Sequence, residues 1–153
     1  MAEESVITEE LRNLLGVEAE PEVFEVEKGH IMKFAEAVGD PNPLWNDTEY
    51  ARRARYGSII APPIFLIDEG LTKFADKLMN IKCPLPRTLN GGTEIEYYKP
   101  MKPGDSITTV AKLVDIQEKV GGSGRLLFLI VEVTYQNQKG ELVAKCRNTF
   151  IRR

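Results

Sequence analysis

A run of strand-forming segments in the second half of the chain constrains the fold more than any other feature. Beyond Asn90-Gly91-Gly92, four segments rich in apolar, aromatic and β-branched residues are predicted to be strands. Short turns of glycine and polar residues separate them, and the last two of these turns are predicted to be hairpin connections between antiparallel neighbours. The strands are expected over residues 95–98, 106–116, 126–136 and 142–151, with turns at residues 103–105, 121–124 and 138–140. This half of the chain predicts an antiparallel sheet.

The first half of the chain predicts helices and one short strand. Apolar residues at i, i+3, i+4 and i+7 from Ile31 to Val38 predict a helix, which Gly39 and Asp40-Pro41 end. Residues 64–79 are expected to form the longest and most buried helix, because they carry many apolar side chains. Residues 40–46 contain two prolines and are expected to form a rigid loop. The other expected elements are helices over residues 8–16 and 48–55, with Thr8 and Asp47 as N-caps, and a half-buried strand over residues 24–27.

This order of elements predicts an α+β fold in which a curved antiparallel sheet wraps around a single long helix. The chain has 153 residues, which fits one ordinary domain with a proper core. No internal repeat or linker divides the sequence.

The hexapeptide Asp40-Pro41-Asn42-Pro43-Leu44-Trp45 links this pattern to a known family. It resembles the Asp-x-Asn-Pro-x-His signature of the MaoC-like hydratase/dehydratase family, whose members add water to acyl thioesters or remove it from them. The resemblance extends from about Leu11 to Phe150 and is greatest for the N-terminal type of MaoC dehydratase domain. That type is often the non-catalytic partner of a complete domain, as in heterodimeric 3-hydroxyacyl-thioester dehydratases. The matching segments are residues 34–43, 56–63 and 99–105.

The resemblance implies a hotdog fold with Pro63 to Met79 as the central helix. It also implies a division of the chain into an N-terminal helix and tail, residues 1–20, and a MaoC-like hotdog domain, residues 21–153.

The resemblance also assigns roles to individual residues. In active members the Asp and His of the signature hold and deprotonate the water, so Asp40 is the candidate catalytic residue and Trp45 stands in place of the His. An indole N–H donates a hydrogen bond but accepts no proton near neutral pH, so Trp45 cannot act as the base. Active members also polarise the thioester carbonyl with a backbone N–H, and that position falls on Pro63, which has none. The candidate substrate-binding residues are Asn42, Trp45, Ile60, Ala61, Pro62 and Pro63.

Each of these assignments has a structural alternative. Asp40 and Asn42 can simply cap and stiffen a proline turn, as Asx residues commonly do. Trp45 can fill the space of a disused site instead of lining an acyl pocket. Arg52, Arg53 and Arg55 can contact coenzyme A phosphates or can form a solvated helix face.

Composition excludes several classes of function. A net charge of −3 does not favour nucleic-acid binding, and no segment is long and apolar enough to span a membrane. Cys83 and Cys146 are too few for a zinc site with a single His, so we expect no metal and two buried reduced thiols. No signal peptide precedes the first helix, and a cytoplasmic location is expected. We also expect no cofactor, because an acyl-CoA or acyl-carrier-protein thioester would be the substrate itself.

The sequence therefore predicts a structural and acyl-binding subunit of an enoyl-thioester hydratase or (R)-3-hydroxyacyl-thioester dehydratase. Its partner would be an identical copy or a catalytic MaoC-like hotdog subunit, because hotdog sheets leave an edge that normally pairs. Two alternatives remain open at this stage. One is an autonomous homodimeric acyl-CoA hydratase or thioesterase, and the other is a non-enzymatic acyl-CoA-binding module.

Overall fold

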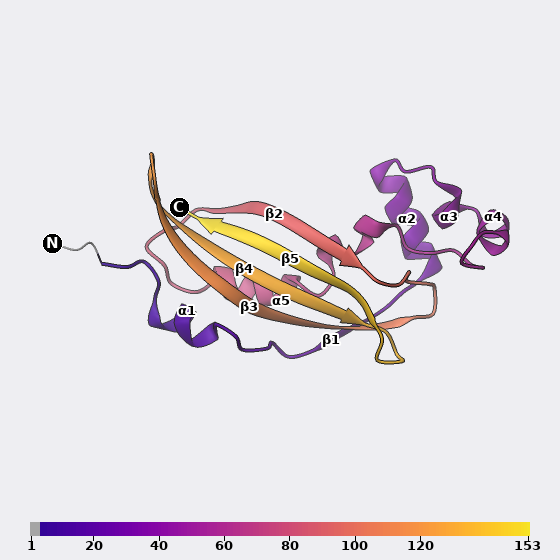
Figure 1. Ribbon diagram of the computed structural model, residues 1–153. Coiled ribbons are helices and arrows are strands. Elements are labelled where there is room, and N and C mark those ends of the chain that lie inside the picture. The colour runs from indigo at the N-terminus through magenta and orange to yellow at the C-terminus, as the bar shows by residue number, and fades with distance from the viewer. Residues whose placement is uncertain (1–3) are drawn as a thin grey trace.

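The computed structural model describes residues 4–153 as a five-stranded antiparallel sheet with helices on one face and beyond one end (Figure 1). The strand order is β1-β3-β4-β5-β2, and every neighbouring pair is antiparallel. The strands are β1 (Glu22–Glu25), β2 (Thr88–Tyr97), β3 (Ser106–Gly121), β4 (Gly124–Gln136) and β5 (Leu142–Arg152). The α+β class and the antiparallel sheet predicted from the sequence are confirmed.

The sheet has one apolar face, which forms the core. Along β3 and β4, buried and half-buried residues alternate, because successive side chains point to opposite faces of a strand. The fully buried side chains of β4 are Leu127, Leu129, Val131, Val133 and Tyr135. Helix α5 (Thr72–Met79) packs on this face and buries Phe74 and Leu78.

The prediction of one long central helix over residues 63–79 is wrong in one respect. The segment consists of a 3₁₀ helix, η1 (Pro63–Asp68), followed by the eight-residue α5. Gly70 separates them with a left-handed φ of +74°, and its backbone lies against the side chain of Thr109 on β3. The apolar periodicity continues across the break, which is why the sequence predicts a single helix.

Tyr135 stabilises the break from the sheet side. Its buried phenol on β4 donates a hydrogen bond to the carbonyl oxygen of Glu69 (2.7 Å), and the carbonyl oxygen of Leu66 lies 3.4 Å away. Carbonyl groups at a helix end lack partners within the helix, so this hydroxyl satisfies the end of η1. Burial raises the pKa of Tyr135, which keeps the phenol in its donating form.

Three helices form a small lobe beyond the end of the sheet (Figure 1). They are α2 (Lys28–Val38), α3 (Pro43–Asn46) and α4 (Thr48–Arg53). The expected loop over residues 40–46 is partly wrong, because its second half is the helical turn α3. Pro43 is at the first helical position, where proline is favoured, and Asn42 caps the turn. Asp47 caps α4 by accepting a hydrogen bond from the N–H of Tyr50 (3.0 Å), as predicted.

The N-terminal part of the chain covers one edge of the sheet. Helix α1 (Glu9–Leu14) begins at the predicted cap Thr8. The N–H groups of Gly16 and Ala19 then donate to the carbonyl oxygens of Leu113 and Ala111 on β3, both at 2.8 Å. Together with β1, this segment pairs with β3 from residue 106 to residue 113. Of the tail predicted over residues 1–20, the first three residues lie outside the described part of the chain.

The opposite edge of the sheet is open. In residues 4–153, β2 pairs only with β5, and most of its residues are exposed. No helix in this part of the chain has the length and apolar character needed to cross a membrane.

The tight contact at Gly70 makes a sharp test of this packing. In Gly70→Ala, the new Cβ would lie 2.5 Å from the Cβ of Thr109, on a backbone that disfavours L side chains. We expect the free energy of unfolding to fall by about 2–4 kcal/mol. The control is Gly29→Ala in α2, where a Cβ meets nothing within 4 Å. It should keep or raise stability, by up to about 1 kcal/mol. Urea denaturation measures the stability of both variants. An unchanged unfolding midpoint for Gly70→Ala would contradict the tight contact at the break between η1 and α5.

Candidate functional site

A hollow of about 350 Å³ lies where the helical lobe meets the end of β2. Two segments line it: the stretch from α3 to the start of η1, and the stretch that follows β2. The lining residues are Leu44, Trp45, Tyr56, Ile60, Ala61, Pro63, Tyr97, Tyr98, Lys99, Pro100 and Met101.

Backbone hydrogen bonds tie the walls of this hollow together. The N–H of Ile60 donates to the carbonyl oxygen of Leu44 (3.2 Å), and the N–H of Ala61 donates to that of Met101 (2.8 Å). The ammonium group of Lys102 donates to the carbonyl oxygen of Tyr56 (2.9 Å). Residues distant in sequence are therefore fixed around one cavity.

Trp45 is the central residue of the motif and is both buried and part of the wall. Only 8% of its surface is exposed, and it lies within the helical turn α3. Its indole Nε1 is buried and has no hydrogen-bond partner in the described part of the chain. A buried N–H donor without an acceptor lowers the stability of the fold. Trp45 therefore carries an unsatisfied polar group at this position.

Of the two prolines after Ala61, Pro63 lines the hollow. Pro62 caps η1 and Pro63 is its first residue, where the missing N–H costs nothing because first-turn donors have no helical acceptor. Pro63 lines the hollow together with the buried Ile60 and Ala61, whereas Pro62 is buried outside its lining. A thioester carbonyl next to Pro63 would receive no backbone hydrogen bond from it, because proline has no N–H.

Asp40 and Asn42 do not line this hollow. Asp40 accepts a hydrogen bond from the N–H of Asn42 (3.1 Å), and Asn42 accepts one from the N–H of Leu44 (3.0 Å). These are the Asx contacts of the turn-forming alternative. Asp40 borders a separate hollow beside α2, with Met32 and Asn46 among its other lining residues. The structure thus brings together four of the predicted binding residues, namely Trp45, Ile60, Ala61 and Pro63.

Two tyrosines after the Gly91-Gly92 pair add polar groups to the wall. Tyr97 and Tyr98 line the hollow, whereas the nearby Ser58 hydroxyl donates to the carbonyl oxygen of Ile59 (2.9 Å). Burial, with a smaller effect of Cys146, raises the pKa of Tyr97 to about 12. A hydrogen bond with Glu96 raises the pKa of Tyr98. Both phenols therefore stay neutral near physiological pH and act as donors, not as bases.

The sequence missed other wall residues. Tyr56, Lys99 and Met101 lie in the matching segments 56–63 and 99–105 but were not predicted as site residues. The bonds from Lys102 to Tyr56 and from Ala61 to Met101 hold these two segments together at the hollow. His30 is exposed, as its place on the polar side of α2 predicts, and its ring contacts Phe65 edge-on at 4.8 Å. Within residues 4–153 no group of three His, Cys, Asp or Glu side chains could hold a metal ion.

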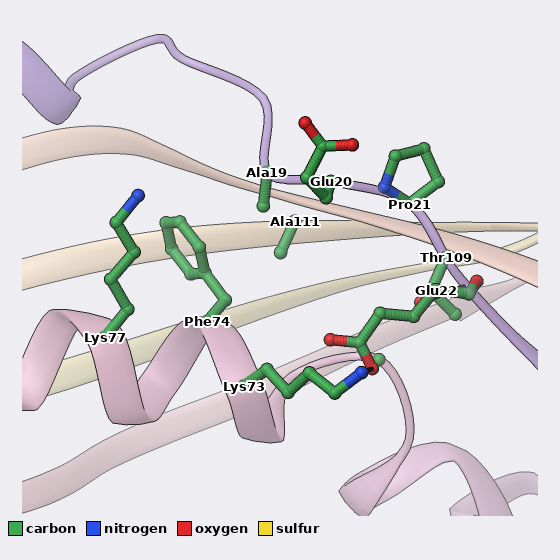
Figure 2. A pocket seen from close by; sticks show the side chains of 10 residues that line it. Ala19, Glu20, Pro21, Glu22, Lys73, Phe74, Lys77, Thr109 and Ala111 are labelled. Carbon is green, nitrogen blue, oxygen red and sulfur yellow. Dashed lines mark hydrogen bonds and ion pairs between the residues drawn. The ribbon is translucent and has the colours of Figure 1, made fainter.

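A second hollow, of about 250 Å³, lies between the N-terminal segment, α5 and β3 (Figure 2). Its floor consists of small or apolar side chains, Ala19, Phe74 and Ala111. Charged groups surround it, and Lys73 forms an ion pair with Glu22 at 3.8 Å. None of the motif residues reaches it, so we take the first hollow as the candidate site.

Comparison with known proteins places this chain in a family. Residues 13–146 match the family described as "FAS1-like, dehydratase domain region", and the chain belongs to it. A protein of Saccharopolyspora erythraea called "UPF0336 protein" is 31% identical over 133 residues, covering 85% of this chain and 82% of that protein. The "probable enoyl-CoA hydratase alpha subunit" of Thermomonospora curvata is 27% identical over 141 residues, covering 80% of this chain and 43% of that protein.

Solved structures show the same fold. The crystal structure of the HadBC complex of Mycobacterium tuberculosis, a (3R)-hydroxyacyl-ACP dehydratase, contains a chain that superposes with a TM-score of 0.75 at 21% identity. The match covers 90% of this chain and 96% of that one. The fold is therefore that of the MaoC-like hotdog dehydratases.

The Asx contacts of the motif can be tested by stability. In Asn42→Ala, the turn loses the side-chain acceptor for the N–H of Leu44, and we expect unfolding free energy to fall by about 0.5–2 kcal/mol. Asn46→Ala is the control, because Asn46 is exposed at the other end of the same turn. Thermal melting compares the two, and equal losses would show that the Asn42 cap adds nothing.

Proposed function

We propose that this chain is the structural and acyl-binding subunit of an enoyl-thioester hydratase or (R)-3-hydroxyacyl-thioester dehydratase. A second MaoC-like hotdog chain supplies the catalytic Asp and His. In this assignment the hollow between the helical lobe and β2 receives the acyl thioester, and the reaction takes place on residues of the partner.

The observation that carries this proposal is Trp45. It occupies the signature position at which a hydratase needs a proton acceptor, and its buried indole can only donate. General acid/base catalysis contributes about 10²- to 10⁴-fold to such reactions, so the chain by itself lacks the largest identifiable part of the chemistry. Pro63 adds to this, since it offers no N–H to a thioester carbonyl.

The position of Asp40 argues against an autonomous enzyme. Its carboxylate accepts a hydrogen bond from the motif backbone and borders a different hollow from Trp45. A water molecule held by Asp40 would thus lie outside the cavity that contains the candidate acyl-binding residues. This geometry supports a role for Asp40 in the fold of the motif.

The open edge of β2 supports a partner. Exposed apolar side chains lie on β2, just after it and on η1: Leu89, Tyr97, Tyr98, Ile64 and Ile67. Unpaired strand edges with apolar neighbours normally find a partner strand. The Mycobacterium tuberculosis relative of this fold is a two-protein complex, and the Thermomonospora curvata relative is called an alpha subunit. We propose pairing of β2 with the matching strand of a second hotdog chain.

The activity of the chain alone tests the proposal. We expect negligible hydration of crotonyl-CoA by the purified chain, and activity after co-expression with a hotdog chain that carries the complete Asp-x-Asn-Pro-x-His signature. Asp40→Asn in this chain should leave the activity of the complex unchanged. Substitution of the signature His in the partner should abolish it. Full activity of the chain alone, lost in Asp40→Asn, would make it an autonomous hydratase.

The pairing edge has its own test. We expect the chain to sediment as a dimer at micromolar concentration, and Leu89→Lys to weaken the dimer by placing a charge on the open edge. Val120→Lys is the control, because it also removes an exposed apolar side chain but lies at the β3–β4 hairpin. Equal weakening by both variants, or a monomer both alone and in the presence of the catalytic hotdog chain, would refute pairing through β2.

A further inference from the structure

Arg55 differs from the two arginines that precede it in the sequence. On α4, Arg52 and Arg53 both contact the carboxylate of Glu49, at 2.8 Å and 3.9 Å. Arg55 follows that helix, and within residues 4–153 it has no carboxylate partner. Its guanidinium carbon instead lies 5.7 Å from the centre of the Tyr56 ring.

Tyr56 connects this guanidinium to the hollow. The Tyr56 side chain belongs to the cavity wall, and its carbonyl oxygen is held by Lys102. Lys99, the cation within the wall itself, pairs with Glu141. Of Arg52, Arg53, Arg55 and Lys99, Arg55 is the one that has no carboxylate partner within residues 4–153, and it is exposed next to a wall residue.

The chemistry of this arrangement suits a phosphate group. A guanidinium stacked on an aromatic ring keeps its charge and its planar set of N–H donors, and such a fork binds phosphate oxygens in pairs. An acyl thioester of the proposed class reaches its enzyme on a phosphopantetheine arm, whose phosphate stays outside when the thioester end is buried. The neutral Tyr97 phenol in the wall of the hollow can donate to an amide carbonyl of the same arm, whereas the Tyr98 phenol is engaged with Glu96.

We propose that Arg55, stacked on Tyr56, binds the phosphate of the phosphopantetheine arm whose acyl thioester enters the hollow. This inference rests on the proposed acyl-binding function and adds the group by which the carrier is recognised. The phosphate is common to coenzyme A and to acyl carrier proteins, so Arg55 serves either carrier.

The fluorescence of Trp45 can be used to measure ligand binding in the hollow. Trp45 is the chain's single tryptophan and lines the hollow, so its fluorescence reports occupation of the site. The probes are hexanoyl-CoA, hexanoyl carrier protein and hexanoyl-pantetheine, which has no phosphate. We expect Arg55→Gln to weaken binding of the first two by roughly tenfold, the usual effect of losing a charge-assisted hydrogen bond, and to leave hexanoyl-pantetheine unchanged.

Arg53→Gln is the matched control, since it removes an equally exposed arginine of the same segment that already has an acidic partner. Thermal melting establishes that both variants fold. An equal loss in Arg53→Gln, or an equal loss for hexanoyl-pantetheine, would overturn the role of Arg55. A loss confined to hexanoyl-CoA would also overturn it, because Arg55 would then contact the nucleotide phosphates. If Trp45 responds to none of the three probes in the unmodified chain, the acyl-binding function itself fails.

Discussion

The contact between Gly70 and Thr109 sets the arrangement of everything on the apolar face of the sheet. At Gly70 the chain turns with a left-handed backbone that lies so close to Thr109 that a Cβ there would clash with β3, and a new helix begins after this turn. Tyr135 then secures the end of η1 from the sheet side. The start of η1, with Pro62 and Pro63, is thereby held at the junction with the helical lobe. The candidate site is a consequence of how one short helix fits one curved sheet.

Most of the fold could be predicted from the sequence because it depends on local signals. The alternation of β3 and β4, the polar hairpins between strands, and the caps Thr8 and Asp47 all act over a few residues. The split of the central helix could not be predicted in the same way. It depends on Thr109, a residue about forty positions away, so nothing in the local pattern reports it.

The candidate site was predictable only in part, for the same reason. The motif and the Ala-Pro-Pro segment indicate Trp45, Ile60 and Ala61, which do line one hollow. Asp40 belongs to the same short motif, yet its position on the turn directs it to a different hollow. Lys99 and Met101 lie in the matching segment 99–105, but their place beside the motif depends on tertiary hydrogen bonds such as that from Ala61 to Met101, which no local pattern encodes.

The two edges of the sheet have different consequences for how far an assembly can grow. The chain seals the β3 edge with its own N-terminal segment, through the bonds from Gly16 and Ala19, and leaves the β2 edge unpaired. If β2 pairs as proposed, the four-residue β1 at the other edge offers too little strand for a second association, and assembly would stop at a pair. If residues 15–25 detached, the long strand β3 would become a second available edge, and the same chain could extend into an open fibre. The short N-terminal segment would then also limit aggregation.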